Sequence, residues 1–520
     1  MTGTEDKLRD LWAKVLHIAP ENIGIYHDFL FCGGDSLEAI ALVNAARRRG
    51  IHFSVAQLYQ LGNIAALAKF GGGEVHDDSH IPSFSLLNTA DITKLQAIAA
   101  QQCDIKIGLV QDIVPTLDMQ SFYLHCQRRQ PYTWQVFLAY DLPRDIDLGR
   151  VRRAWEELLG QYPITKTRFI DTYSGLLQVI LKEDKVHWRS ETSLTELLEA
   201  CKTEDMSFRQ RTHQSALLEA NNHMPRRLIW YVNHAIVDQI TYEHIVQELS
   251  ALYQGHTGSL LKRKPFKSLV RHRLNSDKMS AQRFWQSRLS GAKYVALFKA
   301  INNTQSVACS RLSCEASIKL PRWLKNSGYS SVVTAWAIAF TRFAGVKDIP
   351  FVMMRAGRAS TLPGSEDMMG PLLTRAPLRV SVERGAAIVD LLRHVNRDIE
   401  DSRSFEILRE EGFRCACPEA PAHLEYGIYV NFVPPSAGLN IGPDALFALP
   451  GDVRDGIGSQ TLPFILSGEL RYWSIKMDVT WDEQCIPREC IQMLLNDFQS
   501  LLQSLVQLSL NMTVNDVLSV

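Results

Sequence analysis

A fifteen-residue stretch without hydrophobic periodicity divides this chain into two unequal parts. The stretch, Gly71–Ser85, contains three glycines, three acidic residues and a proline, a composition typical of a flexible tether. The 520-residue chain is also too long for one ordinary core, because domains contain roughly 150 residues. We therefore expect separate globular units on the two sides of the tether.

The part before the tether predicts a compact helical unit over residues 4–70. Apolar residues between Leu8 and Leu16 recur at the spacing that lines one face of a helix, and Pro20 ends that helix. Three further helices are expected, one from near Ser36, one at Val55–Tyr59 and one at Ile64–Phe70. This pattern predicts a small four-helix bundle.

Apolar runs of two kinds alternate after the tether, from about Gln111 onward. WQVFLAYDL and RLIWYVN are typical of strands, whereas VRRAWEELLGQ and TYEHIVQELSALY have the amphipathic spacing of helices. This alternation predicts a mixed α/β fold. A basic stretch of low apolar content, Leu261–Lys278, predicts a boundary within it. We expect a linker at 71–110, a first lobe at 111–270 and a second lobe at 271–515.

Charge and composition exclude several classes of protein. Lys plus Arg and Asp plus Glu both number 56, so no net field attracts nucleic acid or an anionic membrane surface. With 46% hydrophobic and 22% charged residues, the composition is that of a folded soluble protein. The most apolar stretch, Ser330–Phe340, is too short to cross a bilayer and predicts a buried helix. We expect no nucleic acid and no membrane among the partners.

The N-terminus and the cysteines favour a cytoplasmic protein. The first residues, MTGTEDKLRDLW, lack the basic start and short apolar run of a secretory signal. The ten cysteines are scattered without a CxxC spacing, which argues against a zinc or dithiol site. We therefore expect reduced thiols and no metal.

The segment FLFCGGDSLEAI, Phe29–Ile40, places a serine at the start of a predicted helix. Two glycines precede Asp35 and Ser36, and Glu38 follows Asp35 by three residues, as in a capping box. An anionic group on the Ser36 hydroxyl would lie against exposed amides and the positive end of the helix dipole. Taken alone, the segment more often marks a plain glycine turn with a helix cap.

The motif GGDSLEAI, in the second helix of a small bundle, resembles the thiolation (peptidyl carrier) domains of nonribosomal peptide synthetases. The resemblance covers residues 4–70 and implies a 4′-phosphopantetheine arm, attached to Ser36 by a phosphopantetheinyl transferase. Such an arm presents an acyl thioester to neighbouring domains at high effective concentration. Cys32 stands where the family often has Leu or Ile, which we interpret as a packing change.

A second candidate site lies where a strand-like run leads into Asn233 and His234, before a helix predicted from about Gln239. Side chains at such a switch lie at the open edge of a sheet, where active sites of layered α/β folds gather. Asp238 is close enough to brace the turn, or it only caps the next helix. Without context, a single histidine is more often an ordinary packed or surface residue.

The segment NHAIVDQIT resembles the HHxxxDG signature of condensation domains, with His234 at the second histidine and Asp238 at the aspartate. Four other segments resemble family motifs in the same order along the chain: Gln111–Leu124, Ala154–Phe169, Arg358–Val380 and Tyr426–Phe432. The resemblance implies a two-lobed α/β fold of the chloramphenicol-acetyltransferase type, with its active site in a tunnel between the lobes.

The family pattern also implies roles for individual residues. His234 is implied to be catalytic in the aminolysis of a thioester, either as a general base or as the group that positions the amine. Asp238 is implied to be structural and to pair with an arginine of the second lobe. Arg358 is our first candidate for that arginine, and Arg355 is the second.

Two departures from the signature modify the expected reaction. Gln239 replaces the glycine after the aspartate, which affects only the local turn, and Asn233 replaces the first histidine. A first position other than histidine, like the opening PTLDMQ, resembles fungal terminal condensation domains, which join a peptide's own amine to its thioester carbonyl. No second carrier motif follows residue 432 and no GxSxG elbow is present, in keeping with release. We expect macrocyclisation of a carrier-bound peptidyl thioester that upstream adenylation and condensation domains supply.

Two alternatives stay open at this point. The domain could elongate a chain or transfer the acyl group to an external amine or alcohol. It could also be an inactive docking platform that lost activity with Asn233. A product that contains an added amine would favour the first alternative.

Overall fold

The computed structural model describes most of the chain. The described residues are 2–16, 18–29, 32, 34, 38–39, 42–43, 45–46, 49–51, 53, 55–70, 81–88, 91–173, 175–201, 204, 206–219, 226–256, 263–292, 310–317, 328–358, 362, 364–418, 424, 427–433, 451–452, 464–471, 474–483, 486–506 and 512–518.

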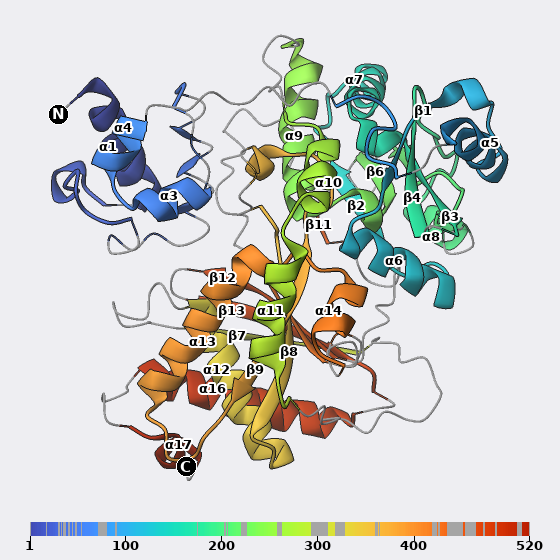
Figure 1. The fold of residues 1–520 in the computed structure, drawn as a ribbon. Helices are drawn as coiled ribbons and strands as arrows, with labels where there is room; N and C mark the ends of the chain where they lie inside the picture. The colour runs from blue at the N-terminus through green and yellow to red at the C-terminus, as the bar shows by residue number, and fades with distance from the viewer. Residues whose placement is uncertain are drawn as a thin grey trace.

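The N-terminal helical unit forms a separate small bundle, on the left in Figure 1. Three of the four predicted helices are described: α1 (Gly3–Leu16), α3 (Val55–Leu61) and α4 (Ile64–Phe70). Their apolar faces enclose one core, in which Trp12 meets Phe29 edge to face with the ring centroids 5.0 Å apart. Much of the helix predicted from near Ser36 lies outside the described residues.

Part of the range predicted as a linker, 71–110, is folded onto the first lobe. Helix α5 (Ile92–Gln102) begins at Asp91, whose side chain accepts a hydrogen bond from the Lys94 amide at 2.9 Å. Leu95 and Ala99, one turn apart, pack against the core of the first lobe. The predicted linker range 71–110 therefore contains a helix that packs on the first lobe.

The first lobe contains two antiparallel sheets. The strands are β1 (Val110–Pro115), β2 (Gln135–Asp141), β3 (Thr167–Thr172), β4 (Gly175–Leu181), β5 (His213–Leu218), β6 (Arg227–Asn233) and β11 (Gly451–Asp452). The helices are α6 (Asp118–Arg129), α7 (Leu148–Gln161), α8 (Leu194–Cys201), α9 (Gln239–Gln254) and α10 (Phe266–Leu274). One sheet has the order β1-β4-β3 and the other β11-β2-β6-β5. Both strand-like runs, and both helical runs, form the predicted elements.

The second lobe is built on one mixed sheet. Its strands are β7 (Ser310–Ser317), β8 (Asp348–Arg355), β9 (Thr374–Ser381), β10 (Ile428–Val433), β12 (Phe464–Arg471) and β13 (Ser474–Trp481). Its helices are α11 (Lys278–Leu289), α12 (Gly328–Ala344), α13 (Ile388–Ser402), α14 (Glu410–Ala416), α16 (Arg488–Val506) and α17 (Val514–Leu518). The order is β7-β13-β12-β10-β8-β9, and β10 runs parallel to both of its neighbours.

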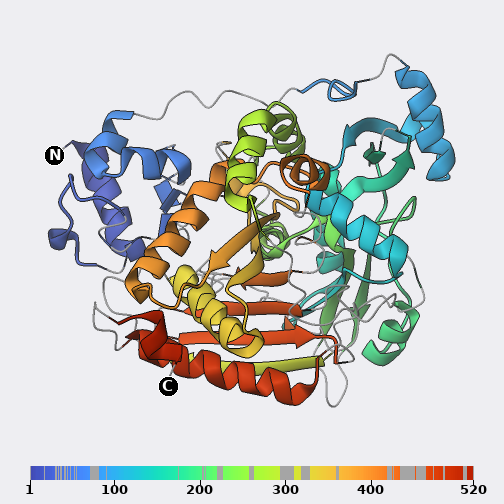
Figure 2. The same ribbon diagram turned by 60° about the horizontal axis from the view of Figure 1, so that its bottom comes forward.

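Two long helices, α12 and α16, lie side by side against the sheet of the second lobe (Figure 2). The apolar stretch Ser330–Phe340 is the buried part of α12, as predicted. Trp336 of α12 stacks on Phe498 of α16 with the ring centroids 4.5 Å apart. No helix within the described ranges combines the length and apolarity needed to cross a bilayer.

The two lobes share a sheet. β11 falls within the range predicted as the second lobe, 271–515, yet it extends the sheet of the first lobe. Gly451 pairs with Ala139 of β2, and Asp452 pairs with Leu138. The short strand covers the edge of β2 that would otherwise expose its backbone groups. The chain therefore returns to the first lobe after building most of the second.

Candidate active site between the lobes

His234 lies in a short 3-10 helix, η4 (His234–Ile236), that directly follows β6. Its backbone amide donates to the Trp134 carbonyl oxygen at 2.9 Å, and its Nδ1 lies 3.0 Å from the Val237 carbonyl oxygen. A carbonyl only accepts, so Nδ1 carries the proton. The neutral ring then has its lone pair on Nε2, the atom that a general base requires.

Aromatic side chains hold the His234 ring. Tyr123 of α6 stacks on it with the ring centroids 4.7 Å apart, and Trp134 meets it edge to face at 6.1 Å. Tyr123 is fully buried, and this burial raises the pKa of its phenol well above the usual value. Tyr123 is therefore a neutral wall of the site.

Asn233 is fully buried and belongs to the scaffold of the site. Its Nδ2 donates to Gln127 Oε1 at 3.0 Å and to the Met206 carbonyl oxygen at 2.9 Å. Its Oδ1 accepts from the Ala235 amide at 2.9 Å. The sequence carried no signal for Gln127, because its partner lies more than a hundred residues away in a different element.

The turn before β2 is strained where it meets His234. Tyr132 and Trp134 have φ angles of 68° and 55°, a left-handed conformation that bulky residues rarely adopt. Gln127 Nε2 donates to the Thr133 carbonyl oxygen at 2.8 Å, while the next carbonyl receives the His234 amide. Each such residue raises the energy of the backbone by on the order of 1–3 kcal/mol, so these contacts must hold the turn in place.

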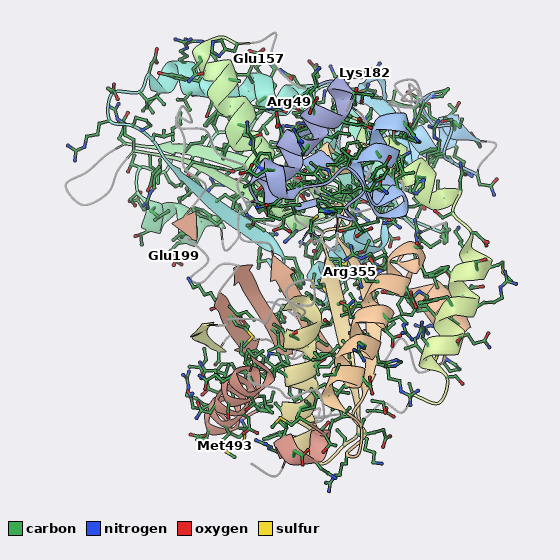
Figure 3. The ribbon with its side chains drawn as sticks, turned by 90° about the vertical axis from the view of Figure 1, so that its left-hand side faces the viewer. Arg49, Glu157, Lys182, Glu199, Arg355 and Met493 are labelled. Atoms are coloured by element: carbon green, nitrogen blue, oxygen red, sulfur yellow. The ribbon has the colours of Figure 1, made fainter. Side chains whose placement is uncertain are left out.

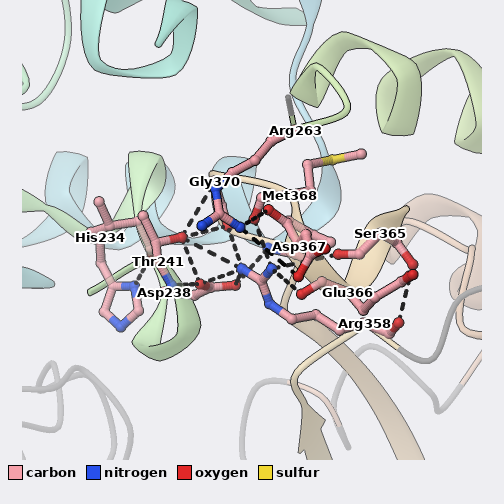
Figure 4. A network of polar contacts seen from close by, with 12 residues as sticks. His234, Asp238, Thr241, Arg263, Arg358, Ser365, Glu366, Asp367, Met368 and Gly370 are labelled. Carbon is pink, nitrogen blue, oxygen red and sulfur yellow. Dashed lines mark hydrogen bonds and ion pairs between the residues drawn. The ribbon is translucent and has the colours of Figure 1, made fainter. Parts of the chain in front are cut away.

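Asp238 and Arg358 form a buried ion pair that joins the lobes (Figure 4). The guanidinium donates to Asp238 Oδ1 at 2.7 Å and to Oδ2 at 2.8 Å. Asp238 also caps α9 by accepting from the Thr241 amide at 2.9 Å, and it accepts from the Leu372 amide at 3.1 Å. The two sequence interpretations of Asp238, as a brace and as a helix cap, thus hold together.

Arg358 also donates hydrogen bonds to a turn of the second lobe. Its guanidinium donates to the carbonyl oxygens of Met368 at 2.7 Å, Glu366 at 3.3 Å and Gly370 at 3.3 Å. The other candidate, Arg355, donates to the carbonyl oxygen of Ile399 at 2.6 Å and pairs with a glutamate of its own lobe. The structure therefore pairs Asp238 with the first candidate.

Two glycines permit the close packing of this junction. Gly357 has a φ of 66°, and a Cβ there would lie 1.7 Å from the Leu372 carbonyl oxygen. Gly370 has a φ of 132°, and a Cβ there would lie 2.5 Å from the Phe266 ring. Glycine alone fits both positions, which flank the loop that Arg358 organises.

Glu243 lies one turn into α9 and is almost fully buried. Burial raises the pKa of its carboxyl to about 7, against smaller lowering effects from the Gln239 hydrogen bond and the Arg358 charge. Glu243 is therefore partly protonated near neutral pH.

A cavity of about 890 Å³ opens between the lobes, walled by the linker, α6, α10 and β9. Arg375 and Asp118, joined by a 2.9 Å hydrogen bond, belong to its wall, whereas His234 does not. The Phe122 ring lies 4.5 Å below the Arg375 guanidinium and 5.7 Å from the Trp134 ring. A continuous row of side chains therefore connects the cavity wall to the histidine.

Ser36 lies outside the described residues, but Gly34, two residues before it, is described. A Cβ at Gly34 would lie 2.4 Å from the Phe29 ring, and its amide donates to the Phe29 carbonyl oxygen at 3.0 Å. Glu38–Ala39 are helical. Close packing at Gly34 and the helical conformation of Glu38–Ala39, on either side of Ser36, are compatible with a phosphate-linked group at a helix start.

Two family models match this chain. One, described as a condensation domain, matches residues 110–406, and the other, described as a phosphopantetheine attachment site, matches residues 6–70.

Two curated relatives illustrate the similarity over nearly the whole chain. The nonribosomal peptide synthetase ungA of Aspergillus violaceofuscus is 27% identical over 96% of this chain, and sidD of Aspergillus fumigatus is 25% identical over 96%. The chain spans only 5% and 24% of the lengths of these two synthetases.

Solved structures share the fold. A structure described as holo T3CT has a TM-score of 0.64 at 17% identity and covers 82% of this chain and 98% of its own. The starter condensation domain of rhizomide synthetase RzmA has a TM-score of 0.61 at 15% identity, covering 77% of this chain and 96% of its own.

Proposed function

This chain belongs to the condensation-domain family of nonribosomal peptide synthetases, and from this premise we propose that it releases a peptide by intramolecular amide formation, or macrocyclisation. A phosphopantetheine carrier precedes the condensation domain, as the sequence predicted, and the two-lobed fold is that of condensation domains. In our proposal, the carrier's own thioester is the electrophile and an amine of the same peptide is the nucleophile.

The observation that best supports release is the pair of hydrogen bonds to the backbone of Ala235, the residue directly after His234. Asn233, the residue that departs from the usual signature, accepts a hydrogen bond from the Ala235 amide at 2.9 Å. Gln120, the last residue of the PTLDMQ motif, donates to the Ala235 carbonyl oxygen at 3.0 Å. The two features that resemble terminal condensation domains thus act together on the backbone that places the histidine.

We assign the proton transfer to His234 Nε2. The amine nitrogen attacks the thioester carbonyl carbon and must lose a proton as the carbon–sulfur bond breaks. Nε2 takes this proton and returns it to the departing thiolate, so the products are an amide and a free thiol. General-base assistance of this kind is worth about 10² to 10⁴ in rate, and orientation of the two ends of the peptide adds to it.

Asp238 takes no part in this proton transfer. Its oxygens already accept hydrogen bonds from Arg358, Thr241 and Leu372, while His234 Nδ1 bonds to a backbone carbonyl. The arrangement therefore differs from the Ser-His-Asp relay of hydrolases, in which the carboxylate contacts the imidazole. Asp238 acts by holding the loop and the second lobe together.

We assign Ser36 as the attachment point on the carrier. The phosphopantetheine arm, when attached, supplies an acyl thioester on a long chain. The remaining requirements belong to this chain's own residues: His234 accepts the proton, Tyr123 and Trp134 hold its ring, and the buried pair of Asp238 and Arg358 keeps the lobes joined.

The test loads the holo-carrier with a linear peptidyl group that has a free amine and identifies the product by mass spectrometry. We expect a product lighter than the linear acid by one water, and none from the same peptide with an acetylated amine. A product formed only with an added external amine or alcohol would favour elongation or acyl transfer. A carrier that keeps its peptide under all conditions would favour a docking platform.

A further inference from the structure

We propose that Asp112 and Lys267 form a clamp that fixes the linker of the carrier on the first lobe and thereby sets how readily the carrier delivers its thioester. We call this pair the linker clamp. The inference rests on the proposed function, because delivery of the thioester can be measured only if the carrier is loaded. Lys267 belongs to none of the motifs that suggested the function, and Asp112 lies in the Gln111–Leu124 motif but had no role assigned to it.

The clamp joins three segments that are distant in sequence. Lys267 of α10 donates from Nζ to the Pro82 carbonyl oxygen at 2.7 Å and to that of Ile81 at 3.4 Å, and forms an ion pair with Asp112 of β1. Asp112 Oδ1 accepts from the Phe84 amide at 2.6 Å. The side chains of Lys267 and Asp112 are only 11% and 8% exposed, so solvent screens the pair weakly.

A bulge in β1 turns the carboxylate inward. Val110 pairs with Leu181 and Asp112 pairs with the adjacent Ile180, so Gln111 is an extra residue in the strand. Gln111 is exposed, whereas Asp112 is buried on the side that faces the linker. Bulges commonly redirect a side chain in this way.

The linker itself is held in an unfavourable conformation. Phe84 has a φ of 62°, in the left-handed region that aromatic residues rarely adopt. Phe84 and Leu87 pack against the core cluster that contains Ile113 and Leu177. A strained residue persists only where its surroundings determine its conformation, and here the Asp112 hydrogen bond and this packing do so.

The clamp therefore shortens the effective tether. Between Phe70, the end of α4, and Ile81 lie ten residues, which limit the separation of those two ends to about 36–40 Å. Release of the linker as far as Asp91, the start of α5, would raise that limit to about 70–75 Å. Effective concentration falls roughly as the −3/2 power of tether length, which corresponds to about a threefold loss.

The test replaces Lys267 with methionine and measures delivery from two sources. One source is the peptide loaded on the chain's own carrier, and the other is the same peptide as a small soluble thioester. We expect Lys267→Met to slow single-turnover release from the carrier about threefold and to leave release from the soluble thioester unchanged. Lys185→Met, at an exposed lysine after β4, is the matched control, and Lys267→Arg should restore part of the rate.

Hydrogen exchange at the Phe84 amide reports the clamp without any turnover. Lys267→Met should accelerate this exchange, and Asp112→Asn, which keeps an acceptor for the amide, should do so less. The clamp would be overturned if Lys267→Met slowed release equally from both thioester sources, or if the rate of release from the carrier were unchanged. If wild-type protein releases nothing from either source, the proposed function fails, and unchanged exchange in Lys267→Met would then separately refute the clamp.

Discussion

Single residues of this site are positioned mainly by backbone carbonyl and amide groups. His234 is oriented by the Val237 carbonyl, and Gln127 by that of Thr133. Asn233 is oriented partly by the Ala235 amide, which donates a hydrogen bond to its Oδ1. Backbone partners keep their place when neighbouring side chains vary, so they can fix a ring to the tolerance that catalysis requires. Changes to these side chains should therefore separate chemistry from folding.

Substitution of His234 tests the chemistry directly. His234→Ala should still accept the loaded arm but should release product at least about 10²-fold more slowly, because the general base is lost. The rate is measured by product formation from the loaded carrier. His125→Ala removes an exposed histidine of α6 and serves as the control. Release at the wild-type rate would show that His234 is a bystander.

Gln127→Met tests the strained turn next to the histidine. The change leaves Asn233 Nδ2 with one partner fewer and removes the donor to the Thr133 carbonyl, which should destabilise the protein by about 1–3 kcal/mol. Because Trp134 would also lose its support, kcat should fall while KM for a soluble thioester changes little. Urea unfolding and steady-state kinetics measure the two effects. A variant that is destabilised but has normal kcat would contradict the positioning role, and Gln161→Met, at an exposed glutamine, is the control.

Glu243 should make stability depend on pH. Its folded-state pKa of about 7 lies above the ordinary value of 4.5, so the native state binds the proton more tightly. Stability should therefore fall as the pH rises from about 4.5 to 7. Glu243→Gln should flatten this window and raise the free energy of unfolding at pH 8 by on the order of 1–3 kcal/mol. Urea unfolding at pH 5 and pH 8 tests this. Glu157 is exposed on the outer surface in Figure 3, so Glu157→Gln should leave the free energy of unfolding unchanged at both pH values. If Glu243→Gln changed the free energy of unfolding equally at pH 5 and pH 8, the prediction would be refuted.

At the scale of elements, the site is the meeting point of the β6–η4–α9 unit with the loop that follows β8. Asp238 serves the first by capping α9, and it serves the junction by pairing with Arg358. The second candidate, Arg355, lies at the level where the lobes meet but bonds to the end of α13 (Figure 3). One buried carboxylate therefore links local secondary structure to the contact between lobes.

Arg358→Ala should destabilise the protein and allow the two lobes to unfold independently. The change leaves Asp238 charged and buried without its cation, which costs about 3–5 kcal/mol. Thermal unfolding should lose cooperativity, and release should fall with it. Arg358→Lys should recover little, because one ammonium cannot reproduce the contacts of a guanidinium with both Asp238 oxygens and four backbone carbonyls. Arg393→Ala, at an exposed arginine of α13, is the control, and a stability close to wild type for Arg358→Ala would contradict the brace.

At the scale of the whole molecule, the carrier and the two-lobed body meet through few described contacts. The Arg403 guanidinium lies over the Tyr59 ring at 5.9 Å. The linker clamp, by contrast, ties the tether firmly to the first lobe.

Ser36 provides the prediction at this scale. Incubation with coenzyme A and a phosphopantetheinyl transferase should add one arm to the chain, and Ser36→Ala should abolish the addition. Intact-mass spectrometry measures the change. The variant should still release product from a soluble thioester, because the condensation domain is intact. A wild-type chain that stays unmodified would refute the assignment of the serine.

Much of this architecture could be predicted from the sequence, because the deciding features are local. The spacing of Leu8 to Leu16, the run before Asn233 and the cap at Asp238 each act within a few residues. The main difference between the prediction and the structure lies at residues 71–110, which were predicted as a linker and contain helix α5.

The sequence alone determined the order of carrier and condensation domain, the place of His234 after a strand, and a choice of two arginines for Asp238. Only the tertiary structure decided for Arg358 and brought Gln127 to Asn233 and Lys267 to the linker. The reason is physical. Helix and strand periodicity is written within one turn or one strand, whereas a buried polar group takes whichever partner the packing of distant elements places beside it.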